Sequence, residues 1–140
     1  MSQETTLILV KPDAVAQGLT GQVLARLEKE GMKILNCRML RLNGPLLKEH
    51  YSHIAHLPFF PEIGKFMSSG PVIAVAMQGA RAIERVRELL GPTDSTKAPK
   101  GTIRGDWGKD KMRNVLHASD SAETAKAELK RFFGSENPGV

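Results

Sequence analysis

The sequence has few of the features that mark a secreted or membrane-embedded protein. It contains one cysteine, Cys37, so no disulfide can form within the chain, and the alternating apolar stretch around it predicts a buried, inert thiol. The longest apolar run is six residues, at 72–77, whereas a membrane-spanning helix needs roughly 20. The first ten residues lack the basic start and the long apolar stretch of a secretory signal. We therefore expect a cytoplasmic protein that does not engage a membrane.

The sequence also lacks the common nucleotide-binding and hydrolase motifs. The stretch EIGKFMSSG at residues 62–70 comes nearest to a Walker motif, but its upstream glycine is missing and Lys65 is followed by Phe66. No G-x-G-x-x-G is present, so any nucleotide site must be of another kind. No G-x-S-x-G elbow accompanies Ser119 and Asp120, which suit a helix cap better than a catalytic triad.

What is present is typical of one folded domain, which we expect to span residues 1–140. The chain is long enough to bury a single substantial core, and its 41% hydrophobic and 25% charged residues are usual for a globular protein. A formal net charge of +5 predicts an anionic partner. Charge alone leaves nucleic acid, an acidic protein and small phosphorylated molecules open.

The apolar pattern alternates between strands and helices and predicts an α/β fold of the α+β sandwich type. Strands are expected at residues 5–10, 33–42, 71–79 and 114–117, and helices at 20–31, 45–54, 62–70, 80–92 and 120–133. Thr20 and Asp120 are candidate N-caps, and residues 92–113 read as a long loop. This order matches a ferredoxin-like split βαβ fold, a four-stranded antiparallel sheet with helices packed on one face.

One histidine, in the stretch RNVLHASDS, has unusual neighbours. His117 ends the last predicted strand and is followed by Ala118 and Ser119, small residues that leave room for a ligand near the next helix. A histidine that acts as a nucleophile or base needs its ring held in one tautomer, and Glu128 in that helix is placed to hold it. On residue types alone, His117 is as consistent with a packed histidine as with a catalytic one.

The remaining candidate features are weaker. His50, His53 and His56 follow one another at spacings of three, but no second pair of ligands completes a metal site, so we expect solvated helix histidines and no metal held by the protein. The stretch LPFFP at 57–61 has two aromatic rings. One is expected to plug the core, and an exposed second ring would offer a stacking surface for a nucleobase.

Together these pieces resemble the nucleoside diphosphate kinase family, from about Thr6 to Phe133. The resemblance rests on KPDAV (11–15), HY (50–51), PFF (58–60), SGPV (69–72), GPTD (91–94), GTIRGD (101–106) and RNVLHASDS (113–121). The combination of GTIRGD, KPD and N-x-x-H-[GA]-S-D-S in this chain is highly specific.

The resemblance implies a two-step exchange of a γ-phosphoryl group between nucleoside tri- and diphosphates through a phosphohistidine at His117, with little base specificity. Other residues take their roles from the family pattern: Lys11, Arg87 and Arg104 contact phosphates, Thr93 the diphosphate, Asn114 the ribose, Phe59 the base and Tyr51 the nucleophile, while Glu128 and Ser119 orient the imidazole. The resemblance also implies Mg²⁺ bound with the nucleotide, mainly by phosphate oxygens and water, and a homo-oligomer, either tetramer or hexamer.

Four positions depart from the commoner family pattern without touching the expected phosphate ligands. Ala118 stands where many relatives have glycine, Trp107 replaces the usual phenylalanine, Ser95 a frequent proline, and Leu57 a common basic residue.

Two other classes of function remain as alternatives. A ferredoxin-like RNA- or single-stranded-DNA-binding module would suit the positive charge, but the predicted strands contain none of the aromatic residues that such a sheet uses, so nucleic-acid binding is expected only as a weak side activity. A phosphate-sensing scaffold would require losses among the motif residues, and all of the matched phosphate positions are present.

Overall fold

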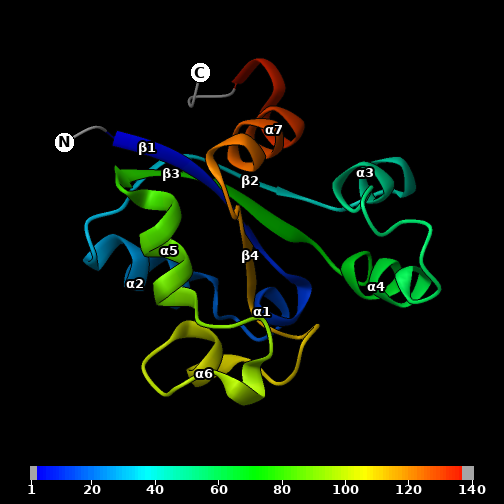
Figure 1. Ribbon diagram of the computed structural model, residues 1–140, viewed down its shortest axis with the longest axis horizontal. Helices are drawn as coiled ribbons and strands as arrows, with labels where there is room; N and C mark the ends of the chain where they lie inside the picture. Colours follow the sequence, from blue (N-terminus) through cyan, green and yellow to red (C-terminus); the bar gives the residue numbers. More distant parts are fainter. Residues whose placement is uncertain (1–2, 137–140) are drawn as a thin grey trace.

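A computed structural model describes residues 3–136, which build a four-stranded antiparallel sheet with helices (Figure 1). The strands are β1 (Gln3–Val10), β2 (Lys33–Leu40), β3 (Val72–Ala80) and β4 (Leu116–Ala118), in the order β2-β3-β1-β4. Every neighbouring pair is antiparallel, which confirms the predicted split βαβ sheet. The two ends of the predicted 1–140 domain lie outside the described residues.

The longer helices match those expected from the sequence, and shorter ones also occur in segments where no helix was expected. They are α1 (Pro12–Ala16), α2 (Thr20–Lys29), α3 (Gly44–His50), α4 (Phe60–Met67), α5 (Ala82–Leu90), α6 (Ile103–Trp107) and α7 (Ala122–Phe133), with 3₁₀ turns η1 (Ser95–Lys97) and η2 (Gly134–Glu136). The short helices α1 and α6 and the turn η1 were not predicted, because segments of three to five residues show too little periodicity. Within residues 3–136 no helix is both long and apolar enough to cross a membrane.

The sheet is covered on both faces, so the expectation of helices on one face is wrong. On one face Ile8 and Val10 pack with helices α1, α2, α5 and α6, and on the other Leu7 and Leu9 pack with α3, α4 and α7. The physical reason is in the central strands themselves: successive side chains point to opposite faces, and a continuous apolar run must be buried on both.

Both expected N-caps are also wrong. The N-cap of α2 is Leu19, which makes no side-chain capping bond, and Thr20 is already inside the helix. The cap of α7 is Ser121, whose hydroxyl oxygen accepts a hydrogen bond from the backbone N–H of Thr124 at 3.1 Å. The sequence offers Ser119, Asp120 and Ser121 in a row, and only the backbone conformation selects which of them caps the helix.

Cys37 is exposed, which corrects the prediction of a buried thiol. It lies on β2, an edge strand of the sheet, where the middle of the strand is open to solvent. Partial burial still raises the pKa of the thiol above its ordinary value, so Cys37 remains protonated and unreactive at neutral pH. Alternation along an edge strand does not guarantee burial, because no helix has to cover it.

Candidate active site

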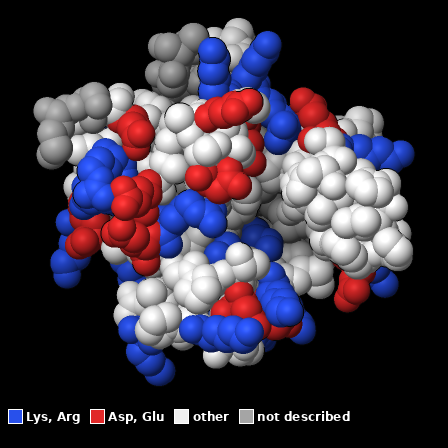
Figure 2. All heavy atoms as spheres, viewed as in Figure 1, with Lys and Arg blue, Asp and Glu red and all other residues white. Residues whose placement is uncertain are grey.

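A cavity of about 860 Å³ lies where β4, α7 and the loops around α6 face the α3–α4 segment. Figure 2 shows Lys and Arg side chains bordering the hollow beside that segment. Nine of the ten predicted site residues line this cavity: Lys11, Tyr51, Phe59, Arg87, Thr93, Arg104, Asn114, His117 and Glu128. Ser119, the tenth, lies behind the wall with no exposed surface. The structure therefore brings together residues that are more than 100 positions apart in the chain.

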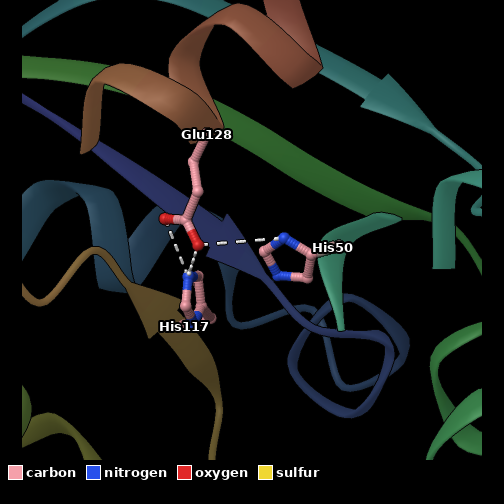
Figure 3. A group of neighbouring side chains, drawn as sticks. All are labelled: His50, His117 and Glu128. Carbon is pink, nitrogen blue, oxygen red and sulfur yellow. Dashed lines mark hydrogen bonds and ion pairs between the residues drawn. The ribbon is translucent and has the colours of Figure 1, made fainter. Parts of the chain in front are cut away.

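His117 is oriented by a carboxylate from α7 (Figure 3). Its Nε2 lies 3.0 Å from Oε1 and 2.9 Å from Oε2 of Glu128. An ionised carboxylate only accepts hydrogen bonds, so Nε2 carries the proton and Nδ1 keeps its lone pair. The side chain of His117 is 31% exposed, so this tautomer presents a free nitrogen nucleophile to an accessible cavity.

Glu128 is itself held by a second donor. The Ser119 hydroxyl donates a hydrogen bond of 2.6 Å to Oε1 of Glu128, and both side chains are buried. Burial alone would raise the pKa of this carboxyl, but the hydrogen bonds from His117 and Ser119 outweigh it and hold the pKa below its usual range. Glu128 is therefore anionic at neutral pH, as its role of acceptor for His117 requires.

His50 is buried in this site, so the expectation of a solvated histidine is wrong for it. The side chain is 1% exposed, and its ring packs edge-on to that of His117, with ring centroids 4.9 Å apart. Burial and the neighbouring His117 lower the pKa of His50 to about 3, although Glu128 opposes the shift. His53 and His56 are exposed, as expected. Histidines at a spacing of three thus separate into one buried ring and two solvated ones.

Lys11 and Asn114 form the floor of the cavity. The Lys11 ammonium donates to Oδ1 of Asn114 at 2.7 Å and to the carbonyl of Met112 at 2.6 Å. The amide nitrogen of Asn114 donates to the carbonyls of Thr93 and Lys111, both at 2.9 Å. An ammonium has three N–H donors, so one remains for a ligand, and a ligand contact to Asn114 would use a lone pair of its oxygen.

Arg104 ties the segment before His117 to the rest of the site. Its three nitrogens donate to main-chain carbonyls: Nε to Asn114 at 3.1 Å, Nη1 to Gly91 at 3.2 Å and Nη2 to Leu116 at 2.7 Å. Burial, together with the charge of Arg87, lowers the pKa of Arg104 to about 10, so it stays cationic at neutral pH. The guanidinium is thus both a structural brace and a buried positive charge beside the cavity.

The backbone next to Asn114 is strained. Val115 has a φ of 78°, in the left-handed region that a β-branched residue avoids. Its N–H donates to Oδ2 of Asp13 at 3.1 Å, and its carbonyl accepts from the N–H of Lys11 at 2.9 Å. Lys11 and Asp13, at the start of α1, therefore stabilise the strained backbone of Val115, which directly precedes β4.

The remaining predicted residues lie at the rim. Arg87 and Thr93 are exposed, and Arg87 donates to the carbonyl of Ala118 at 3.2 Å. Burial raises the pKa of Tyr51 to about 12, so its hydroxyl is a neutral donor at neutral pH. Of the two rings in LPFFP, Phe59 is 49% exposed in the cavity wall, whereas Phe60 packs against the core. The structure thereby identifies Phe59 as the ring available for stacking.

The ligand atoms of His50, His117 and Glu128 lie within 4.8 Å of one another, close enough to consider a metal ion. However, Arg131 Nη1 lies 2.9 Å from Nδ1 of His50 and donates a hydrogen bond to it. A guanidinium is always charged at neutral pH, so it both occupies that lone pair and repels a cation. The contacts favour a hydrogen-bond network at this position over a metal site.

The amino-acid sequence was compared with protein families and with known proteins. A family profile described as nucleoside diphosphate kinase matches residues 4–137. This chain belongs to that family. The nucleoside diphosphate kinase of Staphylothermus marinus is 47% identical over 133 residues, which cover 95% of this chain and 94% of that protein. The nucleoside diphosphate kinase of Archaeoglobus fulgidus is 44% identical over 133 residues, covering 95% of this chain and 88% of its own length.

Solved structures of the nucleoside diphosphate kinase family share the fold. That of the Aquifex aeolicus enzyme has a TM-score of 0.91 and 43% identity, covering 97% of this chain and 99% of its own. The Halobacterium salinarum enzyme, solved in complex with CDP, has a TM-score of 0.93 and 39% identity, covering 97% of this chain and 91% of its own. Fold and family are therefore established by independent comparisons.

The structure gives physical reasons for one family motif, GTIRGD. The Thr102 hydroxyl oxygen accepts a hydrogen bond of 3.0 Å from the N–H of Gly105, which caps α6. A Cβ at Gly105 would lie 1.9 Å from the carbonyl oxygen of Pro99, so only glycine fits there. Asp106 accepts from Gly101 N–H at 2.9 Å and from Arg26 at 2.8 Å. These contacts fold the loop that holds Arg104 in place.

Three of the four departures from the family pattern, Trp107, Ser95 and Leu57, lie outside the cavity lining. Trp107 packs against the core and under the guanidinium of Arg26, 4.2 Å from the ring centroid. Ser95 is buried in η1. Leu57 lies outside the cavity lining, whereas Ala118 lines it with a side chain small enough to leave His117 accessible.

Two site residues, His50 and Arg131, were missed as functional candidates. His50 is part of the family pattern HY, but a histidine followed by two solvated ones carries no sign of burial in its sequence. Arg131 lies three residues after Glu128 on α7, in a turn rich in basic residues that is typical of a helix C-terminus. Only the packing of α3 against α7 makes the two side chains meet.

Proposed function

We propose that this chain is a nucleoside diphosphate kinase, which transfers the γ-phosphoryl group of a nucleoside triphosphate to a nucleoside diphosphate through phosphorylated His117. The observation that carries the proposal is the hydrogen bonding of His117 Nε2 to the Glu128 carboxylate at 2.9–3.0 Å. These bonds leave the Nδ1 lone pair available in a cavity lined by cationic side chains. Family membership supports the same activity.

The transfer takes two steps that are chemically the reverse of each other. In the first, the lone pair of His117 Nδ1 attacks the γ-phosphorus, an N–P bond forms, and the bond to the β–γ bridging oxygen breaks, releasing the diphosphate. No proton has to leave Nδ1, because Glu128 holds the proton of the ring on Nε2. In the second step an oxygen of another diphosphate attacks the phosphorus and returns the lone pair to Nδ1.

Positive charge around the cavity lowers the barrier of both steps. The transferring group spreads negative charge over its oxygens, and fixed cations stabilise that charge more in the transition state than in the ground state. Lys11, Arg87 and Arg104 would supply these cations, Thr93 and Tyr51 would supply hydroxyl donors, and Asn114 would contact the ribose. Phe59, half exposed, would stack on the base, which gives little preference among bases because each has a π-face.

The cavity wall also fits an Mg²⁺ ion that enters with the nucleotide. Mg²⁺ prefers oxygen ligands and keeps several waters, and Asp120 and Glu123 are exposed carboxylates in the wall. These two residues would hold the ion beside the phosphates. When bound, Mg²⁺ would neutralise part of the phosphate charge.

The experiment that tests the function uses the purified protein, Mg²⁺ and γ-labelled ATP. Label is expected on the protein as an acid-labile, alkali-stable phosphohistidine, and addition of GDP should chase it into GTP. CDP and UDP should chase it with similar efficiency if base recognition is by stacking. Folded protein that acquires no label would contradict the proposal.

An alternative function, RNA binding on an open sheet, receives no support from the fold. RNA recognition motifs stack bases on aromatic residues of an exposed sheet face. Here both faces of the sheet are covered by helices, and the four strands contain no aromatic residue. Weak binding through the basic loops stays a prediction that a titration at several salt concentrations would test.

The ionisation of Lys11 predicts a pH dependence of the first step. Burial lowers the pKa of Lys11 to about 8, so the ammonium is charged below that pH and neutral above it. The value of kcat/KM, which reports the free enzyme, is therefore expected to fall as pH rises through about 8. The Lys11→Arg variant should lose this fall, since arginine stays charged, while its absolute rate drops. A wild-type profile that stays flat to pH 10 would rule out this role.

We further propose that the chain assembles as a homo-oligomer through β2, the edge strand of the sheet within residues 3–136. The side chain of Met39 on this strand is 60% exposed, and an exposed apolar side chain on an edge strand favours association with another chain. Light scattering is expected to give a multiple of the 15.3 kDa chain mass, and Met39→Lys should shift the distribution toward smaller species. A wild-type protein that is monomeric at every concentration would contradict the assembly.

A further inference from the structure

Arg131 lines the cavity and contacts the site through His50. It lies in the last turn of α7, and its side chain is 15% exposed. Nη1 donates a hydrogen bond of 2.9 Å to Nδ1 of His50, and Nε lies 3.5 Å from a carboxylate oxygen of Glu49. The guanidinium therefore reaches His117 only through other side chains.

The bond from Arg131 determines the tautomer of His50. A guanidinium has only donors, so Nδ1 of His50 must offer a lone pair, and the ring proton lies on Nε2. This places His50 in its neutral form. Burial acts in the same direction and, with His117 and Arg131, lowers the pKa of His50 to about 3 against the pull of Glu128.

The neutral state of His50 matters because two histidines adjoin one carboxylate (Figure 3). Oε2 of Glu128 lies 2.9 Å from Nε2 of His117 and 3.8 Å from Nδ1 of His50. If Nδ1 of His50 carried a proton, an ion pair with this oxygen would compete with the bond to His117. The nucleophile would then lose the acceptor that keeps its proton on Nε2.

The charged and titratable groups around His50 come from three segments. They are Glu128 and Arg131 on α7, His117 on β4, and Glu49, Tyr51 and His53 beside it in the chain. Among these, only Arg131 directly occupies the nitrogen that faces Glu128.

We propose that Arg131 is a positioning residue: by donating to Nδ1 of His50, it keeps His50 neutral and reserves the Glu128 carboxylate for His117. This inference rests on the proposed function, since it concerns the orientation of the phosphoryl-accepting histidine. In this role Arg131 acts through His50, although its side chain also lines the cavity. Its effect is to extend to low pH the range over which His117 is correctly oriented.

The test is the Arg131→Met variant, which keeps the length and apolar stem of the side chain but removes its donors. Nδ1 of His50 would then be free to take up a proton and face Glu128, and the pKa of His50 should rise, although burial and His117 still lower it. The rate of His117 phosphorylation, relative to wild type, should therefore fall progressively as the pH is lowered below about 6 and change little at about pH 8.

Two control variants separate positioning from general structural damage. Glu49→Gln removes the outer partner of Arg131 but leaves the bond to His50, so its pH profile should match that of wild type. In the double variant Arg131→Met/His50→Asn, position 50 cannot be protonated, and the extra loss at low pH should disappear. An Arg131→Met profile parallel to that of wild type, or lowered equally at every pH, would overturn the proposal.

Nitrogen-15 NMR of the histidine rings gives a readout that does not need activity. In wild type, His50 should show a protonated Nε2, an unprotonated Nδ1 and no titration between about pH 5 and 8. In Arg131→Met the proton should also populate Nδ1, and the ring should titrate at a higher pH than in wild type. Failure of wild type to acquire label would count against the kinase function alone, whereas unchanged His50 titration in an active Arg131→Met variant would count against this inference alone.

Discussion

Replacing His117 by asparagine is expected to abolish phosphoryl transfer, with a loss of at least about 10⁴-fold in rate. The amide can still donate to Glu128, so the buried carboxylate keeps a partner and the fold should persist. What disappears is the lone pair of Nδ1, the atom that forms the N–P bond. The measurement is protein labelling from γ-labelled ATP, followed by chase with GDP.

The control for this variant is His56→Asn, which changes an exposed histidine outside the cavity lining. Its labelling and thermal unfolding are expected to match those of wild type. Labelling of a well-folded His117→Asn protein at the wild-type rate would mean that another residue accepts the phosphoryl group. The wall residue to examine next would then be His53, whose exposed imidazole also lines the cavity.

The Arg104→Ala substitution is expected to reduce both activity and stability. Loss of a charge-assisted phosphate contact, worth about 1.5–3 kcal/mol, should lower the rate at least tenfold. The carbonyls of Asn114, Gly91 and Leu116 would also lose their donor, which should reduce the free energy of unfolding by about 2–4 kcal/mol. Transfer kinetics and denaturant unfolding measure the two effects separately.

A matched control is Arg113→Ala in the same loop region. Arg113 is 53% exposed, pairs with Asp110 at 2.8 Å and does not line the cavity. A surface pair of this kind contributes at most about 1 kcal/mol, so rate and stability should change little. If Arg104→Ala behaved like Arg113→Ala, the proposed brace and phosphate contact at Arg104 would both be wrong.

Most of the predicted site residues came from motif resemblance. The structure shows what each of these motifs, which lie far apart in the sequence, contributes to the site. KPD holds the strained turn at Val115, GTIRGD folds the loop that carries Arg104, and the last motif supplies His117. Each motif meets a local requirement, a particular turn, loop or side chain, so its residue types can be recognised in the sequence. Their convergence on one cavity depends on the antiparallel pairing of β1 with β3 and β4.

The errors concern burial and capping, which depend on neighbours distant in sequence. Cys37 alternates like a core residue but lies on an edge strand, and the spacing of His50 suggests a solvated helix although α7 covers it. Ser121 rather than Asp120 caps α7, because backbone dihedrals decide among adjacent polar residues. In each case the local pattern was compatible with two environments.

The sequence by itself determined the order of the main strands and helices and the family. These follow from apolar periodicity and from short motifs, both of which are local properties of the chain. The tertiary structure alone decided which histidine is buried, which ring of LPFFP is exposed and that Arg131 meets His50. Such contacts join segments up to 81 residues apart, and no local pattern encodes the distance between two side chains that only packing brings together.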